Sequence, residues 1–160
     1  MSGGNYFQDL FREPLRHFSG SGRSTFWAES ISIIRRSPWL GMGINTYSQM
    51  AKGKGGYPHN CYLQLTAEMG LFGLVSFLWM IIVLFHRAAQ YSRKVDDAFL
   101  LFVLSGSKAG LMAFLVHSFV DTNFYSVQLG NLMWLAMGVI VAVEKIDQRL
   151  KEHANVGKAY

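Results

Sequence analysis

Three long apolar runs constrain this chain more than any other feature. Residues 69–85 and residues 122–143 contain no charged side chain, and residues 98–120 contain only Lys108 and His117 as ionisable residues. With a rise of about 1.5 Å per residue, each run with its flanking residues reaches the ~30 Å hydrocarbon thickness of a bilayer. The 160-residue chain is too short to cover three such helices with polar surface. The sequence predicts an all-α integral membrane protein, with spans at about 62–85, 98–120 and 124–143.

The loop charges predict the orientation of these spans. The loop 86–97 and the segment after residue 143 carry most of the nearby basic residues, whereas residues 121–126 carry none. By the positive-inside rule, the loop 86–97 and a tail of residues 144–160 are expected in the cytoplasm. Residues 1–61 then form an extracytoplasmic basic loop segment that precedes the membrane region 62–143. The net charge of +5 favours anionic partners, either membrane lipids or phosphate groups, and no nucleic acid partner is expected.

The segment 1–61 holds seven of the fifteen Lys and Arg residues. Short amphipathic helices are expected in it. Residues 7–18 show near-helical apolar spacing, with a plain loop as the alternative. A second helix is expected over 24–37, capped by Ser24 and ended by Pro38. The apolar stripe of this second helix is predicted at helical spacing and consists of Trp27, Ile31 and Ile34.

Familiar nucleotide and metal motifs do not fit. The stretch 52–56 lacks the spacing of a Walker A loop, and the Gly-Met-Gly at 41–43 does not follow a strand. A single cysteine, Cys61, excludes an internal disulfide. We expect no metal site and no cofactor, because the residue types that bind metals are too scattered along the chain, at His59, Glu68, His117 and Asp121.

Three motifs occur in a fixed order. They are Gly22-Arg23-x-x-x-Trp27, then Pro38-Trp39-Leu40-Gly41-Met42-Gly43-x-x-x-Tyr47, then His59-Asn60-x-Tyr62-Leu63-Gln64-x-x-x-Glu68-x-Gly70-x-x-Gly73. Together they span roughly residues 19–90. This combination resembles the O-antigen ligase and O-antigen polymerase superfamily of bacterial membrane glycosyltransferases.

The resemblance implies a multi-pass enzyme of the bacterial inner membrane. Such enzymes transfer or polymerise a glycan from an undecaprenyl diphosphate carrier onto a sugar, lipid or protein hydroxyl, without a metal in the ligases. Family members are longer, with many spans before this loop. We therefore expect the C-terminal portion of a longer enzyme, with the missing N-terminal half as a further partner. The alternative is a non-catalytic membrane subunit or truncated remnant, whose basic outer segment binds anionic lipid or a partner protein.

The same resemblance implies catalytic roles for Arg23 and His59. A guanidinium at a helix N-terminus suits a lipid diphosphate leaving group, and an imidazole with a reference pKa near ~6.5 suits proton removal from an acceptor hydroxyl. The alternatives are a headgroup-binding arginine and a helix-capping or interfacial histidine. Weaker substrate-binding candidates, with solvated surface charge as their alternative role, are Arg35, Arg36, Lys52 and Lys54.

Lys108 lies near the centre of the second predicted span. A lone charge at that depth costs at least ~2.5–3.5 kcal/mol, so Lys108 is expected to face protein or a cavity. In a straight antiparallel first span, Glu68 would lie within a few ångströms of the same depth. We therefore predict a structural Glu68–Lys108 ion pair. The alternative is that Lys108 faces a cavity or an upstream helix.

Overall fold

The chain is an all-helical membrane protein. The computed structural model describes residues 23–50 and 57–157, and these ranges contain helices and no strand. Three of the helices are long and apolar enough to cross a membrane, as predicted. In chain order the elements are α2 (Arg23–Arg36), α3 (Tyr47–Met50), α4 (Cys61–Tyr91), α5 (Ala98–His117), the 3₁₀ helix η1 (Asn123–Tyr125) and α6 (Val127–Gly157).

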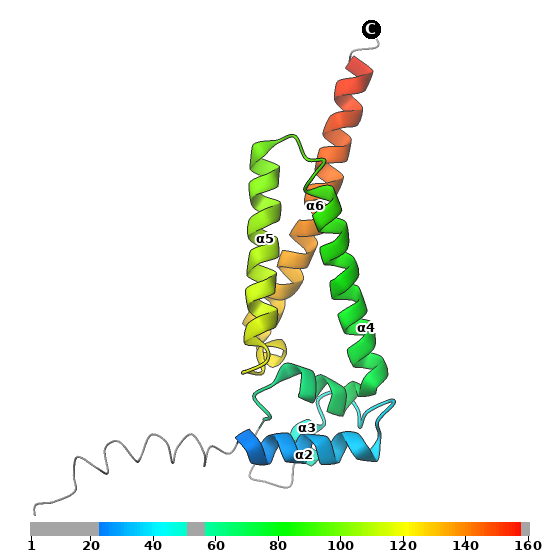
Figure 1. Cartoon of the computed structure of the whole chain (residues 1–160), viewed down its shortest axis with the longest axis vertical. Coiled ribbons are helices and arrows are strands. Elements are labelled where there is room, and N and C mark those ends of the chain that lie inside the picture. Colours follow the sequence, from blue (N-terminus) through cyan, green and yellow to red (C-terminus); the bar gives the residue numbers. More distant parts are fainter. Residues whose placement is uncertain (1–22, 51–56, 158–160) are drawn as a thin grey trace, which may run out of the picture.

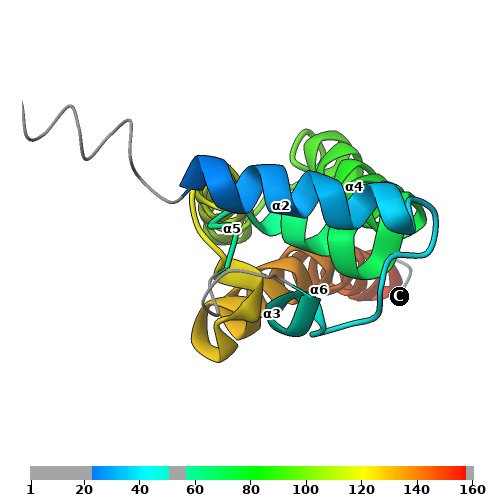
Figure 2. The ribbon, with the colours of Figure 1, turned by 90° about the horizontal axis from the view of Figure 1, so that it is seen from below.

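The spans give the molecule two distinct ends. Figure 1 shows α4, α5 and α6 running lengthwise, with α2 lying across one end together with α3 and the turn between α5 and α6. We call this the site end. The loop between α4 and α5 and the last turns of α6 lie at the opposite end. Seen from below, in Figure 2, α2 crosses over the first turns of α4.

The third apolar helix continues beyond the predicted span. α6 continues through residues 144–157, which the sequence analysis assigned to a separate tail. This extension is tied to the opposite end of the bundle by Arg87–Glu144 at 3.0 Å and by Lys151–Asp96 at 3.1 Å. Lys151 also pairs with Asp147 at 3.0 Å, one turn earlier on the same helix. α6 therefore stays helical beyond its apolar residues, because ion pairs hold this polar part of the helix against the bundle.

α2 lies within one residue of its predicted bounds, but only part of its predicted buried face is correct. Of the predicted stripe, Trp27 and Ile31 are exposed and Ile34 is half-buried against the core, whereas the fully buried side chains are Ser30 and Ile33. The cause is Tyr47, whose hydroxyl lies 2.7 Å from Ser30 Oγ and donates to Phe26 O at 3.2 Å. A serine therefore faces inward because the buried tyrosine hydroxyl needs a polar partner.

A sharp break at Gly70 redirects the first span. Gly70 has φ 70° and ψ −176° inside α4. Figure 1 shows that α4 has a short transverse part at the site end and a long part that runs into the bundle. The backbone of residues 38–43 packs on this break. Met42 N donates to Ala67 O at 3.0 Å, and Leu71 N donates to Pro38 O at 2.8 Å. We call this contact of residues 38–43 with residues 67–72 the glycine clasp.

Two glycines are required by the clasp. A Cβ on Gly70 would lie 2.2 Å from Trp39 O, and a Cβ on Gly41 would lie 2.3 Å from Glu68 O. Both glycines also have positive φ, a region that side chains disfavour. The spacing of the Pro-Trp-Leu-Gly-Met-Gly and Glu-x-Gly motifs is thus explained by backbone packing.

Candidate functional site

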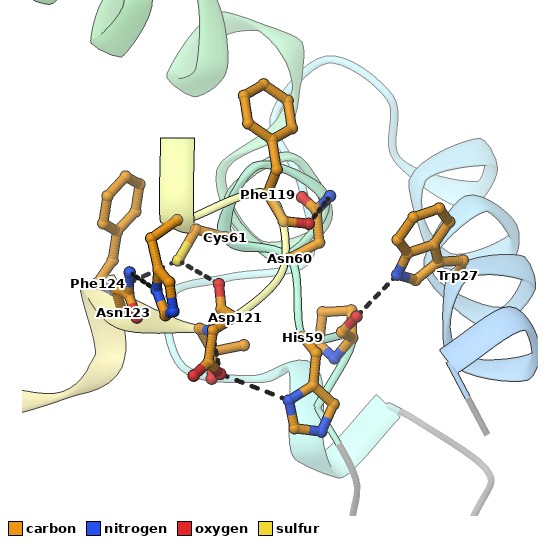
Figure 3. A network of polar contacts seen from close by, with 11 residues as sticks. Trp27, His59, Asn60, Cys61, Phe119, Asp121, Asn123 and Phe124 are labelled. Carbon is orange, nitrogen blue, oxygen red and sulfur yellow. Dashed lines mark hydrogen bonds and ion pairs between the residues drawn. The ribbon is translucent and has the colours of Figure 1, made fainter. Parts of the chain in front are cut away.

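His59 is held in place by its two sequence neighbours. The carbonyl of Pro58 accepts a hydrogen bond from Trp27 Nε1 at 2.9 Å. Asn60 caps α4 by accepting from Leu63 N at 3.0 Å, and its amide nitrogen donates to Phe119 O at 3.1 Å. Between these fixed residues His59 adopts a left-handed backbone, with φ 46°. Such conformations persist where the surroundings impose them, and here the half-exposed imidazole is turned toward the 118–126 turn (Figure 3).

The residue that meets His59 is Asp121. Its Oδ1 lies 3.5 Å from His59 Nδ1 and accepts a hydrogen bond from Thr122 N at 2.7 Å. The Thr122 amide, followed by the nearby His59, lowers the pKa of Asp121. A carboxylate beside Nδ1 favours the tautomer with the proton on Nδ1, which leaves Nε2 as the basic nitrogen. The pair is therefore suited to accepting a proton at Nε2.

Cys61 fastens the turn that carries Asp121. Its amide donates to Ser118 O at 2.9 Å, its thiol donates to Asp121 O at 3.1 Å, and its sulfur accepts from Phe124 N at 3.4 Å (Figure 3). The side chain is fully buried. Cys61 thus links the start of α4 to both ends of the turn, and its role is structural.

A polar pocket of about 450 Å³ opens beside Asp121. Its walls offer hydroxyl, carboxylate and amide groups, and they consist of Tyr57, Asp121, Thr122, Asn123, Tyr125, Ser126 and Leu129. The amide nitrogen of Asn123 lies 2.7 Å from His117 Nδ1, while its oxygen is buried with no hydrogen-bond partner in the described part of the chain. Such a surface can hydrogen-bond a ligand rich in hydroxyl groups.

An apolar groove of about 570 Å³ lies on the other side of η1. It runs between α4 and α6, with Phe72, Phe77, Met80 and Trp134 among its lining residues. Its remaining wall includes Phe124, which lies in sequence between two residues of the polar pocket. A polar and an apolar binding surface are therefore separated by a single short turn.

Glu68 joins three segments at the site end. Its buried carboxylate accepts hydrogen bonds from Asn45 N at 2.8 Å, Tyr47 N at 3.2 Å, Gln64 Nε2 at 3.3 Å and Tyr125 Oη at 2.7 Å. Burial, and then the hydrogen bond to Glu68, raise the pKa of Tyr125, so its hydroxyl remains a donor. Through Tyr125 this carboxylate supports one wall of the polar pocket.

The predicted Glu68–Lys108 pair does not form. Lys108 is not among the partners of Glu68, whose two oxygens each accept two hydrogen bonds. The depth estimate assumed a straight first span. Because α4 breaks at Gly70, Glu68 stays at the site end, whereas Lys108 lies at the middle of α5.

The Glu68 network predicts unequal effects for two nearly isosteric changes. Glu68→Gln turns an NH₂ group toward donors and leaves two of them unpaired, which should cost about 2–4 kcal/mol. Tyr125→Phe removes one hydrogen bond and should cost about 1–2 kcal/mol. Thermal unfolding in detergent measures both, with Gln128→Glu as an exposed control. Equal stabilities of the Glu68→Gln variant and the wild type would contradict the network.

The structure places the remaining predicted site residues as follows. Arg23 begins α2, one helical turn before Trp27, and its side chain lies outside the described residues, as do Lys52 and Lys54. Arg35 and Arg36 are exposed in the last turn of α2, at the end away from Arg23. Within the described ranges, no group of three or more His, Cys, Asp or Glu residues is arranged to hold a metal ion.

Asp121 and the pocket residues Tyr57 and Tyr125 are not among the site residues predicted from the sequence. His59 and Asp121 are separated by 62 positions, and no local spacing signals their contact. The one available signal was the absence of basic residues from the 121–126 turn, which predicted its location near the segment that carries His59.

Fold and site together define a class: an integral membrane protein with a histidine–carboxylate pair beside a polar pocket at one end of its spans. Residues 2–78 match the family model described as O-antigen ligase. The match confirms the resemblance inferred from the motifs, and the matched segment contains α2, the glycine clasp and His59. No curated protein and no solved structure matches the chain.

Proposed function

We propose that the chain acts in a membrane glycosyltransferase of the O-antigen ligase type, which moves a glycan from an undecaprenyl diphosphate carrier to an acceptor hydroxyl. The observation that carries the proposal is the contact between His59 and Asp121 at 3.5 Å beside the polar pocket. The family match supports it, because His59 lies within the matched segment.

In the proposed step, His59 Nε2 takes the proton of the acceptor hydroxyl while its oxygen bonds to the anomeric carbon of the glycan. The bond between that carbon and the carrier oxygen breaks, and the diphosphate leaves with the electron pair. Asp121 orients the imidazole and stabilises its protonated form. Arg23, at the N-terminus of α2, is proposed to offset the charge on the leaving diphosphate. Contacts with the diphosphate or with lipid headgroups are proposed for Arg35, Arg36, Lys52 and Lys54, and headgroup contact suits Arg35 and Arg36, which lie at the end of α2 away from Arg23.

The two binding surfaces suit the two parts of a lipid-linked glycan. The apolar groove between α4 and α6 is proposed to accept part of the isoprenoid chain, and the polar pocket to accept sugar hydroxyls from the donor or from a sugar, lipid or protein acceptor. The turn containing Phe124 separates them. A ligand that is apolar at one end and polar at the other can therefore contact both surfaces.

The test is transfer in membranes that contain the natural protein. Undecaprenyl-diphosphate-linked glycan and an acceptor are added, and glycosylated acceptor and free undecaprenyl diphosphate are measured together. Their appearance in equal amounts supports the proposal. Unchanged donor with every candidate acceptor, from membranes in which the protein is folded, would favour a non-catalytic membrane subunit instead.

The site end is proposed to face the extracytoplasmic side of the inner membrane. The connections close to the ends of the spans differ in charge: residues 121–126 at the site end contain no Lys or Arg, whereas the opposite end carries Arg87, Arg93, Lys94, Lys145, Arg149 and Lys151. The positive-inside rule places that end in the cytoplasm.

Cysteine labelling tests this orientation. We expect a membrane-impermeant maleimide to label Gln49→Cys in intact cells, and to label Ala154→Cys only after the membrane is opened. Both positions are exposed and lie at opposite ends of the molecule. The native Cys61 is fully buried and serves as the unlabelled background. Labelling of Ala154→Cys alone in intact cells would reverse the orientation.

A further inference from the structure

The turn between α2 and α3 presents an apolar surface that the fold leaves uncovered. The exposed fractions are 61% for Trp39, 76% for Leu40 and 73% for Ile44. The backbone of the same turn is fixed, because it forms the glycine clasp with residues 67–72. These side chains are therefore held outward by a rigid turn.

This surface is continuous with the membrane-facing side of α4. The ring of Trp39 lies 5.7 Å from that of Phe72, which is 60% exposed at the start of the span beyond Gly70. Further along α4, Val75 and Trp79 are also exposed on a helix long and apolar enough to cross a bilayer. Lipid that covers these residues would reach Trp39 without interruption.

Depth also favours contact with lipid. Phe72 follows the break at Gly70 by two residues, so it begins the part of α4 that runs into the bundle, and a bilayer around the spans would have its surface near this residue. Tryptophan prefers this boundary, where its ring can be buried and its N–H can remain near water. Leu40, which directly follows Trp39, and Ile44 would insert their side chains into the acyl region beside it.

We propose that the turn formed by Trp39, Leu40 and Ile44 dips into the bilayer leaflet at the site end and seats α2 on the membrane surface. The occupant of this surface is lipid, not a second copy of the chain. Backbone hydrogen bonds join this turn to residues 67–72. The insertion depth of the turn would therefore fix the height of the site end above the membrane.

Fluorescence quenching in vesicles tests the proposal. The protein carrying Trp79→Phe and Trp134→Phe retains Trp27 and Trp39, and a matched variant that also carries Trp39→Phe supplies the Trp27 signal for subtraction. Each is reconstituted in phosphatidylcholine vesicles with nitroxide labels at the headgroup, at carbon 5 or at carbon 12. Trp79 in a single-tryptophan variant is the deep control, and Asn155→Trp in a tryptophan-free background is the aqueous control.

We expect the Trp39 signal to be quenched at least twofold more by the headgroup and carbon-5 labels than that of Asn155→Trp, and little by aqueous iodide. Trp79 should respond most to the carbon-12 label. Strong iodide quenching of Trp39 without lipid quenching would show a water-exposed turn and overturn the proposal. Protection from both quenchers would show coverage by protein, such as a second copy, and would overturn it equally.

Discussion

Replacement of His59 by alanine is expected to lower glycan transfer by at least about 100-fold, while the protein still inserts and folds. A positioned general base contributes roughly 10²- to 10⁴-fold to a rate, and the proposed step assigns that role to His59 Nε2. The half-exposed imidazole makes few packing contacts, so its loss should change thermal stability little. Transfer from an undecaprenyl-diphosphate-linked donor, measured in native membranes, gives the rate.

His153→Ala is the matched control, because it removes an exposed imidazole from the opposite end of the molecule. Asp121→Asn should lower transfer less than His59→Ala, since it removes the partner that orients the base but leaves the base itself. Transfer near the wild-type rate in the His59→Ala variant would remove His59 from the proposed step. A loss in the His153→Ala variant of the same size would point to general damage.

Gly70→Ala is expected to open the glycine clasp. The added Cβ would lie 2.2 Å from Trp39 O, a backbone atom that cannot move without carrying the turn with it. Steric overlap of this kind, together with a positive φ for alanine, should cost at least about 3 kcal/mol. Because that cost falls on one contact, we expect the turn of residues 38–43 to detach while the three spans remain helical.

Amide hydrogen exchange measures this opening directly. The amides of Met42, Gly43 and Leu71 donate across the clasp, and their exchange should quicken by about 100-fold or more in the variant. Gly106→Ala is the control, because a Cβ there meets no atom within 4 Å and alanine favours a helix interior. Unchanged protection of these three amides in the Gly70→Ala variant would show that the turn does not depend on close backbone contact.

The sequence by itself determined the membrane architecture. Three apolar runs predicted three spans, and Pro38 predicted the end of α2 close to its observed last residue, Arg36. These features are local: hydropathy summed along a helix decides insertion, and a proline ends a helix through its own ring. The ordered motifs also pointed to the family whose model matches residues 2–78, because that segment contains all three motifs.

Only the tertiary structure decided how the site is assembled. Asp121 meets His59 because α4 and α5 bring two turns together across 62 residues, and Cys61 holds those turns in register. Glu68 caps backbone amides instead of pairing with Lys108 because a glycine with positive φ bends α4 away from the straight path that sequence arithmetic assumed. Both outcomes depend on contacts between segments far apart in the chain, which no local pattern encodes.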